Sequence, residues 1–270
     1  MKEIQEDRLR FVAQHWKPGR FDRKQAWKRF RAGIDTPPRL IWGYALATAL
    51  AAVVLGLFLF RGNVRTEIPA TASVRSVVLP DGTQATLAPE ASLSFRRHGF
   101  GRKDRAICQT GTVYYSVARN ASLPFEITAS DGFVRVLGTR FQLEAGGSGS
   151  AVDVMEGRVL FAAAPDKAGK PVREEDGLVL THGMRAELAP GATKPVLAEP
   201  KTANPAAWAT HVFHYEDTPL EEVLRELSAF FGRTLLSDGS GRLTGEFEGE
   251  KPDEIVPLIE EALGIEIEIR

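Results

Sequence analysis

The chain has 270 residues, of which 43% are hydrophobic and 26% are charged, and its formal net charge at pH 7 is −1. This composition excludes a disordered or fibrous chain and leaves room for a membrane span with one or two globular domains. A single cysteine, Cys108, excludes an internal disulfide framework and a cysteine-based zinc site. We expect its side chain to be buried, and intermolecular pairing is the alternative.

The N-terminal segment, residues 1–39, is basic, with eleven Lys or Arg residues against five acidic residues. It is too short and too polar to bury a core alone. Apolar residues recur at helical spacing in two stretches, one ending at Trp16 and one that Asp22 can cap and that carries Trp27 and Phe30. Because this segment cannot form a core of its own, its aromatic side chains predict that it binds in a groove of a partner protein. Adsorption of basic helices to an anionic membrane surface is the alternative.

The stretch from Leu40 to Phe60 contains 21 residues and no charge. As a helix it would be roughly 30 Å long, which is the thickness of the hydrocarbon core of a bilayer. We therefore predict a transmembrane helix over residues 40–60, and a buried core helix is the alternative. The basic residues precede this stretch, whereas the residues after Arg65 include 21 Lys or Arg and 30 Asp or Glu. The positive-inside bias therefore predicts a cytoplasmic N-terminus and an exported, acidic C-terminal part.

Short β-rich runs separated by turn residues fill the chain from Ser73 to about Leu197. The clearest turn is at Pro80-Asp81-Gly82, because proline presets φ and glycine tolerates a positive φ. Strands at intervals of roughly 8 to 12 residues predict an all-β sandwich or barrel within residues 61–200. The predicted strands cover 73–79, 84–87, 92–96, 111–118, 125–128, 133–143, 152–162, 178–181 and 184–188. Four prolines in residues 189–206 are typical of a linker.

Residues 207–270 are predicted to form a second domain, built from a repeat with an offset of 32 residues. Thr218-Pro219-Leu220-Glu221 has the pattern of a capping box, and Gly232 and Gly264 are expected to end two amphipathic helices. A strand-like piece lies before and after each helix. These features predict two βαβ halves that pack their helices on one small sheet.

No catalytic or metal-binding motif is found in the sequence. His211 and His214 would lie on opposite faces of a strand, without further ligands nearby. We therefore predict no catalytic, cofactor-binding or metal-binding residues, no cofactor, and a protein that is not an enzyme.

Four short sequences carry a family resemblance. They are Leu79-Pro80-Asp81-Gly82-Thr83, Pro124-Phe125, Val136-Leu137-Gly138-Thr139-Arg140-Phe141 and Glu156-Gly157-Arg158-Val159. In order and spacing they resemble the FecR family of membrane-bound sigma-factor regulators. Trp208, Phe213 and the run 218–224 are similar to that family's C-terminal domain, which resembles the secretin and TonB short N-terminal (STN) domain.

The resemblance implies a fold and a function. The expected fold is a single transmembrane helix, an all-β FecR-type periplasmic domain and a small α+β, STN-like C-terminal domain. The expected function is that of an inner-membrane anti-sigma factor that relays a periplasmic signal from an outer-membrane TonB-dependent transducer to an extracytoplasmic-function (ECF) sigma factor. Trp16, Trp27 and Phe30 are the expected sigma-factor contacts, and an intramembrane protease is a further expected partner. The alternative function is a membrane-anchored periplasmic binding or scaffold module for envelope components.

Overall fold

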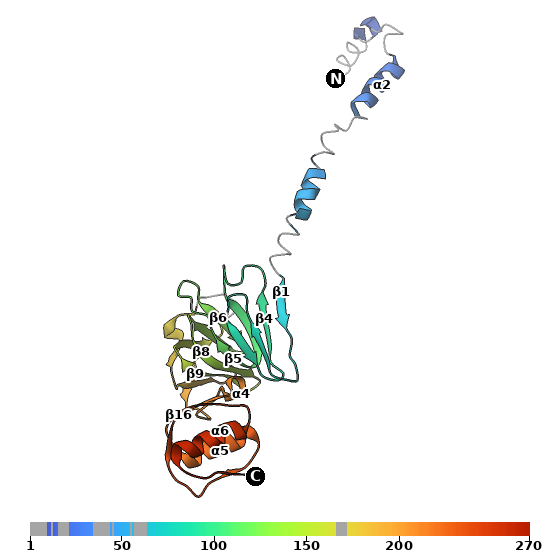
Figure 1. The fold of residues 1–270 in the computed structure, drawn as a ribbon. Helices are drawn as coiled ribbons and strands as arrows, with labels where there is room; N and C mark the ends of the chain where they lie inside the picture. The colour runs from blue at the N-terminus through green and yellow to red at the C-terminus, as the bar shows by residue number, and fades with distance from the viewer. Residues whose placement is uncertain are drawn as a thin grey trace. The chain divides into compact units, whose positions relative to one another are not determined.

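The structure is a computed structural model, and it describes residues 10–11, 13–15, 22–34, 44, 46–54, 56, 64–165 and 172–270. The chain divides into two compact units, Met1–Arg61 and Gly62–Arg270 (Figure 1). The second unit contains a β module, which comprises strands β1 to β13, and a C-terminal module, which comprises α4 and all later elements.

The first unit contains helix α2 (Arg23–Ile34). Further helical residues lie at 10–11, 13–15, 44, 46–54 and 56. The ends of the predicted membrane span, Leu40 and Phe60, lie outside the described residues. Within the part of the chain that the structure describes, no helix is both long enough and apolar enough to cross a membrane.

The described residues of the β module form thirteen strands. They are β1 (Arg65–Ile68), β2 (Arg75–Val78), β3 (Gln84–Leu87), β4 (Ser92–Arg96), β5 (Ala106–Ser116), β6 (Phe125–Ala129), β7 (Gly132–Val136), β8 (Arg140–Gly146), β9 (Gly149–Glu156), β10 (Arg158–Ala163), β11 (Gly177–Thr181), β12 (Arg185–Leu188) and β13 (Val196–Ala198), with the short helix η1 (Glu174–Asp176) before β11. The hydrogen-bonded order is β11-β10-β7-β6-β5-β8-β9-β12-β13, with β1 on β4, β2 on β3, and both β3 and β4 on β5.

The strands form two layers, and β5 belongs to both of them. Its first half pairs with β4 and β6, and its second half pairs with β3 and β8. The strand bends at Gly111, whose φ is +76°, and a Cβ atom there would lie 2.7 Å from the Cα of Ala91. Only glycine fits this bend, because a side chain would meet backbone and the positive φ would be strained.

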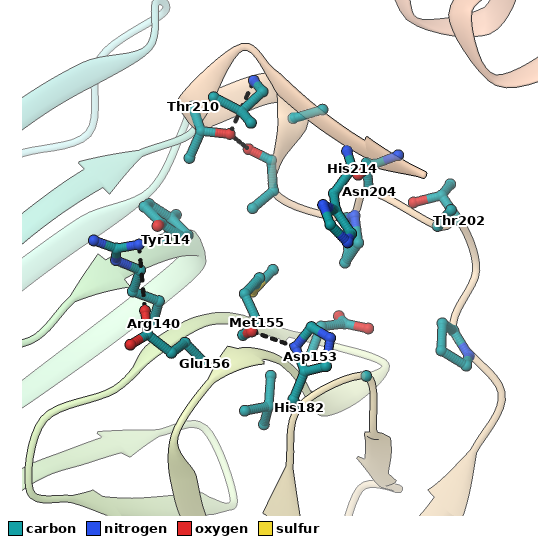
Figure 2. A pocket seen from close by; sticks show the side chains of 18 of the residues that line it. Tyr114, Arg140, Asp153, Met155, Glu156, His182, Thr202, Asn204, Thr210 and His214 are labelled. Atoms are coloured by element: carbon teal, nitrogen blue, oxygen red, sulfur yellow. Dashed lines mark hydrogen bonds and ion pairs between the residues drawn. The ribbon is translucent and has the colours of Figure 1, made fainter. Parts of the chain in front are cut away.

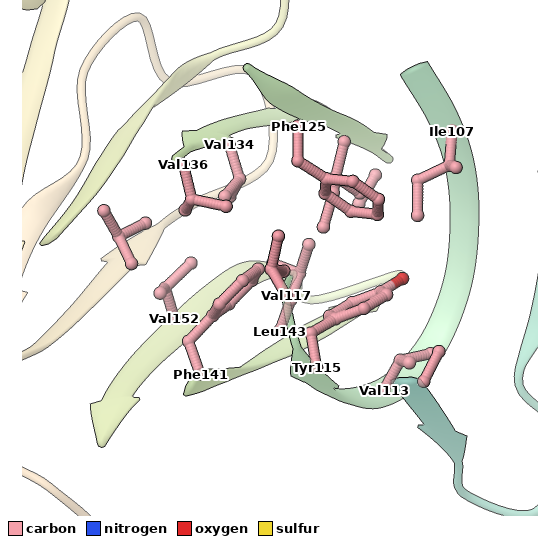
Figure 3. Close-up of a cluster of buried hydrophobic side chains, with 14 of the residues drawn as sticks. Ile107, Val113, Tyr115, Val117, Phe125, Val134, Val136, Phe141, Leu143 and Val152 are labelled. Carbon is pink, nitrogen blue, oxygen red and sulfur yellow. The ribbon is translucent and has the colours of Figure 1, made fainter. Parts of the chain in front are cut away.

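One hydrophobic core lies between the two layers (Figure 3). Phe125 from one layer and Tyr115 and Phe141 from the other are fully buried, and the rings of Tyr115 and Phe141 stack with centroids 5.3 Å apart. The Tyr115 hydroxyl donates to Gln109 Oε1 at 2.7 Å, and Gln109 Nε2 donates to the Leu143 carbonyl at 2.7 Å. The polar atoms inside this core are thus hydrogen-bonded, as burial requires. The prediction of an all-β domain is confirmed.

The turn at Pro80-Asp81-Gly82 is held by buried polar groups. Gly82 has a φ of +86°, as the sequence predicts. Asp81 Oδ2 accepts from Thr83 Oγ1 at 2.8 Å and from Arg105 Nη1 at 3.3 Å. The Arg105 side chain, 1% exposed, also donates to the carbonyls of Ala118 and Leu123, both at 2.7 Å. This arginine therefore ties the turn to the loop that precedes β6.

The segment before β8 is fixed by a close backbone approach. A Cβ atom on Gly138 would lie 2.7 Å from the Cα of Arg119, so a larger residue would push two backbone segments apart. Thr139 is buried, and its hydroxyl donates to the Arg158 carbonyl at 3.0 Å. Gly138 and Thr139 therefore fix the segment before β8 against the backbone at Arg119 and at Arg158.

Several features of the β module differ from the sequence prediction. The predicted strands 133–143 and 152–162 are each interrupted by a bend, so that the first becomes β7 and β8 and the second becomes β9 and β10. Strand β1 lies before the first predicted strand, and β13 lies inside the predicted linker. The prediction of a buried Cys108 is wrong, because Cys108 is exposed. Its neighbours Ile107 and Gln109 point into the core, and side chains alternate along a strand, so Cys108 must point outward.

The C-terminal module confirms the repeat. Its elements are α4 (Ala207–Thr210), β14 (Val212–Pro219), α5 (Leu220–Phe231), β15 (Leu235–Leu236), β16 (Arg242–Glu248), α6 (Pro252–Leu263) and β17 (Glu268–Ile269). Helix α6 begins and ends 32 residues after α5, and the buried residues Val223 and Leu227 correspond to Ile255 and Ile259. Both helices end at a glycine with a left-handed backbone, Gly232 at φ +63° and Gly264 at φ +64°.

Two details of that prediction are wrong. Thr218 is a residue of β14, and no side chain caps α5, so the capping box does not form. The four strands make two separate antiparallel pairs, β14 with β16 and β15 with β17. They do not make one small sheet, because β15 and β17 are only two residues long and pair with each other alone.

Candidate functional site

Helix α2 begins as the sequence predicts. Asp22 Oδ1 accepts from the backbone N–H groups of Lys24 at 2.8 Å and Gln25 at 3.2 Å, and its carbonyl accepts from Ala26 at 2.9 Å. Asp22 is therefore the N-cap, and its negative charge lies at the positive end of the helix dipole.

Two aromatic side chains form an exposed apolar patch on α2. Trp27 is 64% exposed and Phe30 is 60% exposed, and their rings stack with centroids 5.7 Å apart. The helix also carries five Lys or Arg residues and no acidic residue between Arg23 and Ile34. A twelve-residue helix is marginally stable alone in water, so packing of this patch against a partner would stabilise it. The patch offers a partner two aromatic anchors within a positively charged surround.

The other predicted contact, Trp16, lies outside the described residues. Just before it, Phe11 is 63% exposed, and its ring stacks on His15 at a centroid distance of 4.3 Å.

A groove of about 600 Å³ lies in the second unit, between the β module and the start of the C-terminal module (Figure 2). Its polar lining includes Tyr114, Arg140, Asp153 and His182 from the β module, and Asn204 and His214 from the chain that follows. Arg140 forms an exposed ion pair with Glu156 at 3.2 Å, and His182 Nδ1 is hydrogen-bonded to the Met155 carbonyl. These groups can donate and accept hydrogen bonds, but they are spread around the groove rather than convergent on one reacting atom.

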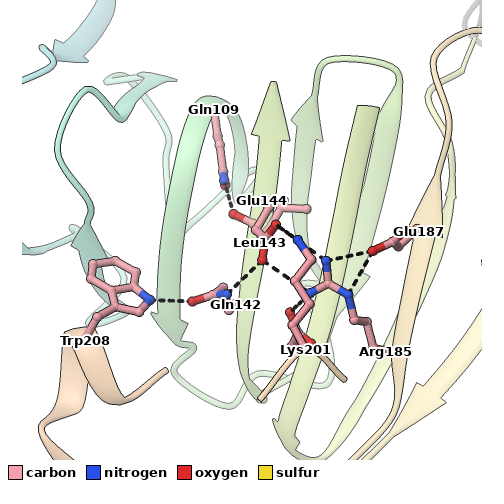
Figure 4. A network of polar contacts seen from close by, with 9 residues as sticks. Gln109, Gln142, Leu143, Glu144, Arg185, Glu187, Lys201 and Trp208 are labelled. Atoms are coloured by element: carbon pink, nitrogen blue, oxygen red, sulfur yellow. Dashed lines mark hydrogen bonds and ion pairs between the residues drawn. The ribbon is translucent and has the colours of Figure 1, made fainter. Parts of the chain in front are cut away.

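A charge cluster lies beside this groove, on the outer face of the layer that contains β8, β9 and β12 (Figure 4). Arg185, with its side chain 1% exposed, donates to Asp153 Oδ2 at 2.5 Å, to Glu144 Oε1 at 3.2 Å and to Glu187 Oε1 at 2.9 Å. Lys201 donates to Glu144 Oε2 at 3.2 Å.

The carboxylates of this cluster differ in their pKa. Burial raises the pKa of Asp153 to about 6, because desolvation outweighs the attraction of Arg185 and the negative Glu144 lies nearby. Burial also opposes ionisation of Glu144, but hydrogen bonds from Arg185 and Lys201 outweigh it, so the pKa of Glu144 is lowered. The cluster holds three carboxylates and two cations, and Asp153 is the member that most readily takes up a proton.

The sequence predicts no catalytic or metal-binding residues, and His211 and His214 are the candidate metal ligands that it considers. Among the described residues, no three His, Cys, Asp or Glu side chains are grouped so that they could hold a metal ion. The prediction that His211 and His214 share a strand is wrong, because His211 ends α4 with a left-handed backbone (φ +56°) and only His214 lies in β14, with its side chain exposed.

Sequence reasoning did not find the charge cluster. The only signal for it was the alternation of polar residues with buried apolar residues in β8, β9 and β12, and that signal does not show which strands are neighbours.

Comparison with known proteins gives one family match. Residues 63–160 match the family model described as FecR protein. No curated protein matches the chain. Two crystal structures from Parabacteroides distasonis, each described as a "putative anti-sigma factor", align with 76% of this chain and 98% of theirs. The structure at 2.50 Å resolution has 20% sequence identity and a TM-score of 0.46, and the one at 1.65 Å has 19% identity and a TM-score of 0.45. Residues 63–160, which run from the start of the β module into β10, are therefore similar to FecR proteins.

Proposed function

We propose that the protein is an inner-membrane anti-sigma factor, which relays a signal from a TonB-dependent transducer of the outer membrane to a cytoplasmic ECF sigma factor. One observation carries this proposal. In a single chain, a FecR-like region at residues 63–160 follows a basic N-terminal segment whose helix α2 exposes the aromatic pair Trp27 and Phe30.

The exposed aromatic pair supports binding of a partner protein by α2. Fully burying a side chain such as Phe contributes about 1.5–3 kcal/mol relative to leaving it exposed, and aromatic residues dominate the energy of many interfaces. The five cations of α2 would speed association with an acidic partner surface. In this proposal the sigma factor provides a groove for the two rings, and Trp16 adds a third anchor.

The membrane assignment is part of the proposal. Residues 40–60 carry no charge, and the large hydrophobic side chains described there, including Leu46, Leu50 and Val53, are 57–72% exposed. So apolar and so exposed a stretch needs lipid or protein around it. The basic residues before it favour a cytoplasmic N-terminus, which places both modules of the second unit in the periplasm.

The periplasmic partners are also proposed. The C-terminal module is assigned an STN-like role from Trp208, Phe213 and residues 218–224, and it is the proposed contact of the transducer. Proteolysis within the membrane would then release the N-terminal segment with its sigma factor.

The experiment that tests the anti-sigma function measures binding of the full chain to each ECF sigma factor encoded beside it. Trp27→Ala removes one aromatic anchor, and we expect its Kd to rise at least tenfold, which corresponds to about 1.4 kcal/mol. Phe30→Ala has a smaller effect in the same direction. Gln25→Ala, at an exposed polar position of the same helix, is the control and leaves the Kd within about twofold.

Two outcomes would count against the proposal. One is that no sigma factor binds the chain. The other is that Trp27→Ala binds as tightly as Gln25→Ala, which would favour the scaffold alternative. Protease treatment of intact spheroplasts tests the topology separately, because only the modules after residue 60 should be digested.

A further inference from the structure

A row of polar side chains crosses the outer face of one layer of the β module. Tyr114, Gln142, Asp153 and Arg185 lie directly opposite one another on the neighbouring strands β5, β8, β9 and β12. Polar residues on the outer face of a sandwich are normally in water. Here Gln142, Asp153 and Arg185 are only 4%, 3% and 1% exposed, so something covers the row.

The chain between the two modules contributes to that cover. Residues 200–208, which we call the strap, follow β13 and end in α4. Lys201 donates to Glu144 Oε2 at 3.2 Å, and Trp208 Nε1 donates to Gln142 Oε1 at 2.5 Å (Figure 4). Gln142 in turn donates to Glu144 Oε1 at 3.2 Å. Both ends of the strap are thus hydrogen-bonded to β8.

The middle of the strap is bonded to the C-terminal module instead. The backbone N–H of Asn204 donates to Glu226 Oε1 at 2.9 Å, and its Nδ2 donates to Glu226 Oε2 at 3.0 Å. Asn204 Oδ1 accepts from the backbone N–H of His214 at 2.6 Å. The strap residue Ala207 is buried in the hydrophobic core of this module.

The two attachments differ in strength. The bonds to Glu226 are a bidentate, charge-assisted pair, and Ala207 adds apolar burial. The bonds to β8 are one neutral hydrogen bond and one ion pair, in which the Lys201 side chain is 63% exposed. Exposed ion pairs contribute little to stability because water and salt screen them. The strap therefore belongs firmly to the C-terminal module and only loosely to the β module.

We propose that the strap is a latch, which holds the C-terminal module against the outer face of β8, β9 and β12 and opens at its bonds to Gln142 and Glu144. When the latch opens, the strap leaves together with the C-terminal module. The polar row across β8, β9 and β12 then becomes accessible to water or to another protein. This inference concerns the second unit alone and does not depend on the proposed anti-sigma function.

The test measures the distance between the two modules. Cys108 is the only cysteine and is exposed on the β module, so it accepts one spin label, and Asp238→Cys provides a second on an exposed position of the C-terminal module. Pulsed electron paramagnetic resonance on the full chain then gives the distribution of distances between the labels. We expect one narrow distribution when the strap is intact.

Two substitutions loosen the latch without touching a core. Lys201→Ala removes the ion pair, and Trp208→Phe keeps an aromatic ring but removes the N–H donor. We expect the double variant to broaden the distribution and add longer distances, with smaller changes in each single variant. Lys194→Ala is the matched control, because Lys194 precedes the strap and bonds within the β module, to the Glu175 carbonyl at 3.4 Å.

The result that overturns the latch is a distribution in the double variant that is identical to that of the intact strap. Equal broadening in Lys194→Ala overturns it as well, because the loosening would then not be specific to the strap. Circular dichroism and thermal unfolding of each variant show that both modules stay folded. If Trp208→Phe fails to fold, Gln142→Leu removes the acceptor of the same bond on β8, and its combination with Lys201→Ala takes the place of the double variant.

Discussion

Two arginines are buried to the same extent in the β module, yet their surroundings differ. Arg105 and Arg185 both have side chains that are 1% exposed. Arg105 donates mainly to backbone carbonyls, with Asp81 as its one acid, and joins two loops. Arg185 donates only to carboxylates, and one of these, Glu144, also binds the strap. Arg105 therefore connects two loops through backbone groups that do not titrate, whereas Arg185 is the centre of a cluster of carboxylates that can.

The largest expected effect comes from removing each arginine. Arg105→Ala leaves the carbonyls of Ala118 and Leu123 without their buried donor and Asp81 without its cation, so we expect the free energy of unfolding to fall by about 3–5 kcal/mol. Most of this cost is the same at pH 5 and pH 7, because carbonyl groups do not titrate. Arg185→Ala leaves three carboxylates together, and protonation can relieve their repulsion. We expect its cost to be smaller at pH 5 than at pH 7.

Urea unfolding of the unit Gly62–Arg270 measures both costs. Arg158→Ala, at an exposed side chain of β10, is the control and changes stability by no more than about 0.5 kcal/mol. The comparison would fail if the cost of Arg105→Ala depended on pH as strongly as that of Arg185→Ala.

The second prediction concerns Asp153, whose pKa is raised from 3.8 to about 6 in the folded state. The charged groups that face it are Glu144 on β8, Arg185 and Glu187 on β12, and Lys201 on the strap. Between about pH 4 and pH 6 the folded state holds a proton that the unfolded state has lost. The contribution of Asp153 to stability therefore falls as the pH rises through this window, by on the order of 2–3 kcal/mol.

Asp153→Asn removes this dependence. The free energy of unfolding of the variant, measured relative to the unsubstituted chain, should therefore rise between pH 4 and pH 7 by that amount. Asp238→Asn, at an exposed position of the C-terminal module, is the control. A constant difference across the pH range would contradict the assignment of Asp153 as the proton-binding member of the cluster.

The smallest effect is expected at Thr83, in the Arg105 region. Its hydroxyl donates to Asp81 at 2.8 Å and accepts from the Ala118 N–H at 3.2 Å. Thr83→Val keeps the shape but removes both bonds. Asp81 Oδ2 still accepts from Arg105, whereas the Ala118 N–H loses its acceptor, and we expect a cost of about 1–2 kcal/mol. Thr110→Val removes an exposed bond to Ser92 at 2.7 Å and serves as the control, with little expected change. Equal thermal unfolding shifts in the two variants would contradict the role of burial.

Local features of the fold could be predicted from the sequence. The apolar faces of α5 and α6, and the glycines Gly232 and Gly264 that end them, each depend only on residues within one helix. The repeat can therefore be recognised in the sequence. The turn at Gly82 and the cap at Asp22 are equally local. The aromatic pair on α2 could be predicted for the same reason, because Trp27 and Phe30 are three residues apart on one helix.

Non-local features could not be predicted in this way. The charge cluster depends on Gln142, Asp153 and Arg185 lying opposite one another, and the register between strands is set by pairing of distant segments. The cluster depends further on the strap, whose Lys201 bonds to Glu144, and the sequence presents this segment as a proline-containing linker. Cys108 was misplaced because Gln109 takes the inward position through its bond to the Tyr115 hydroxyl, a contact six residues away.

The sharing of β5 between the two layers has a mechanical consequence. A force or a protease that detaches this strand removes the central neighbour of β3, β4, β6 and β8 at once. The pairs β2–β3 and β1–β4 then lose their only link to the remaining strands, and the two layers are no longer joined by a shared strand. The β module therefore has no half that can survive alone. It persists whole or is lost whole, and partial digestion of the second unit would leave either the intact sandwich or none of it.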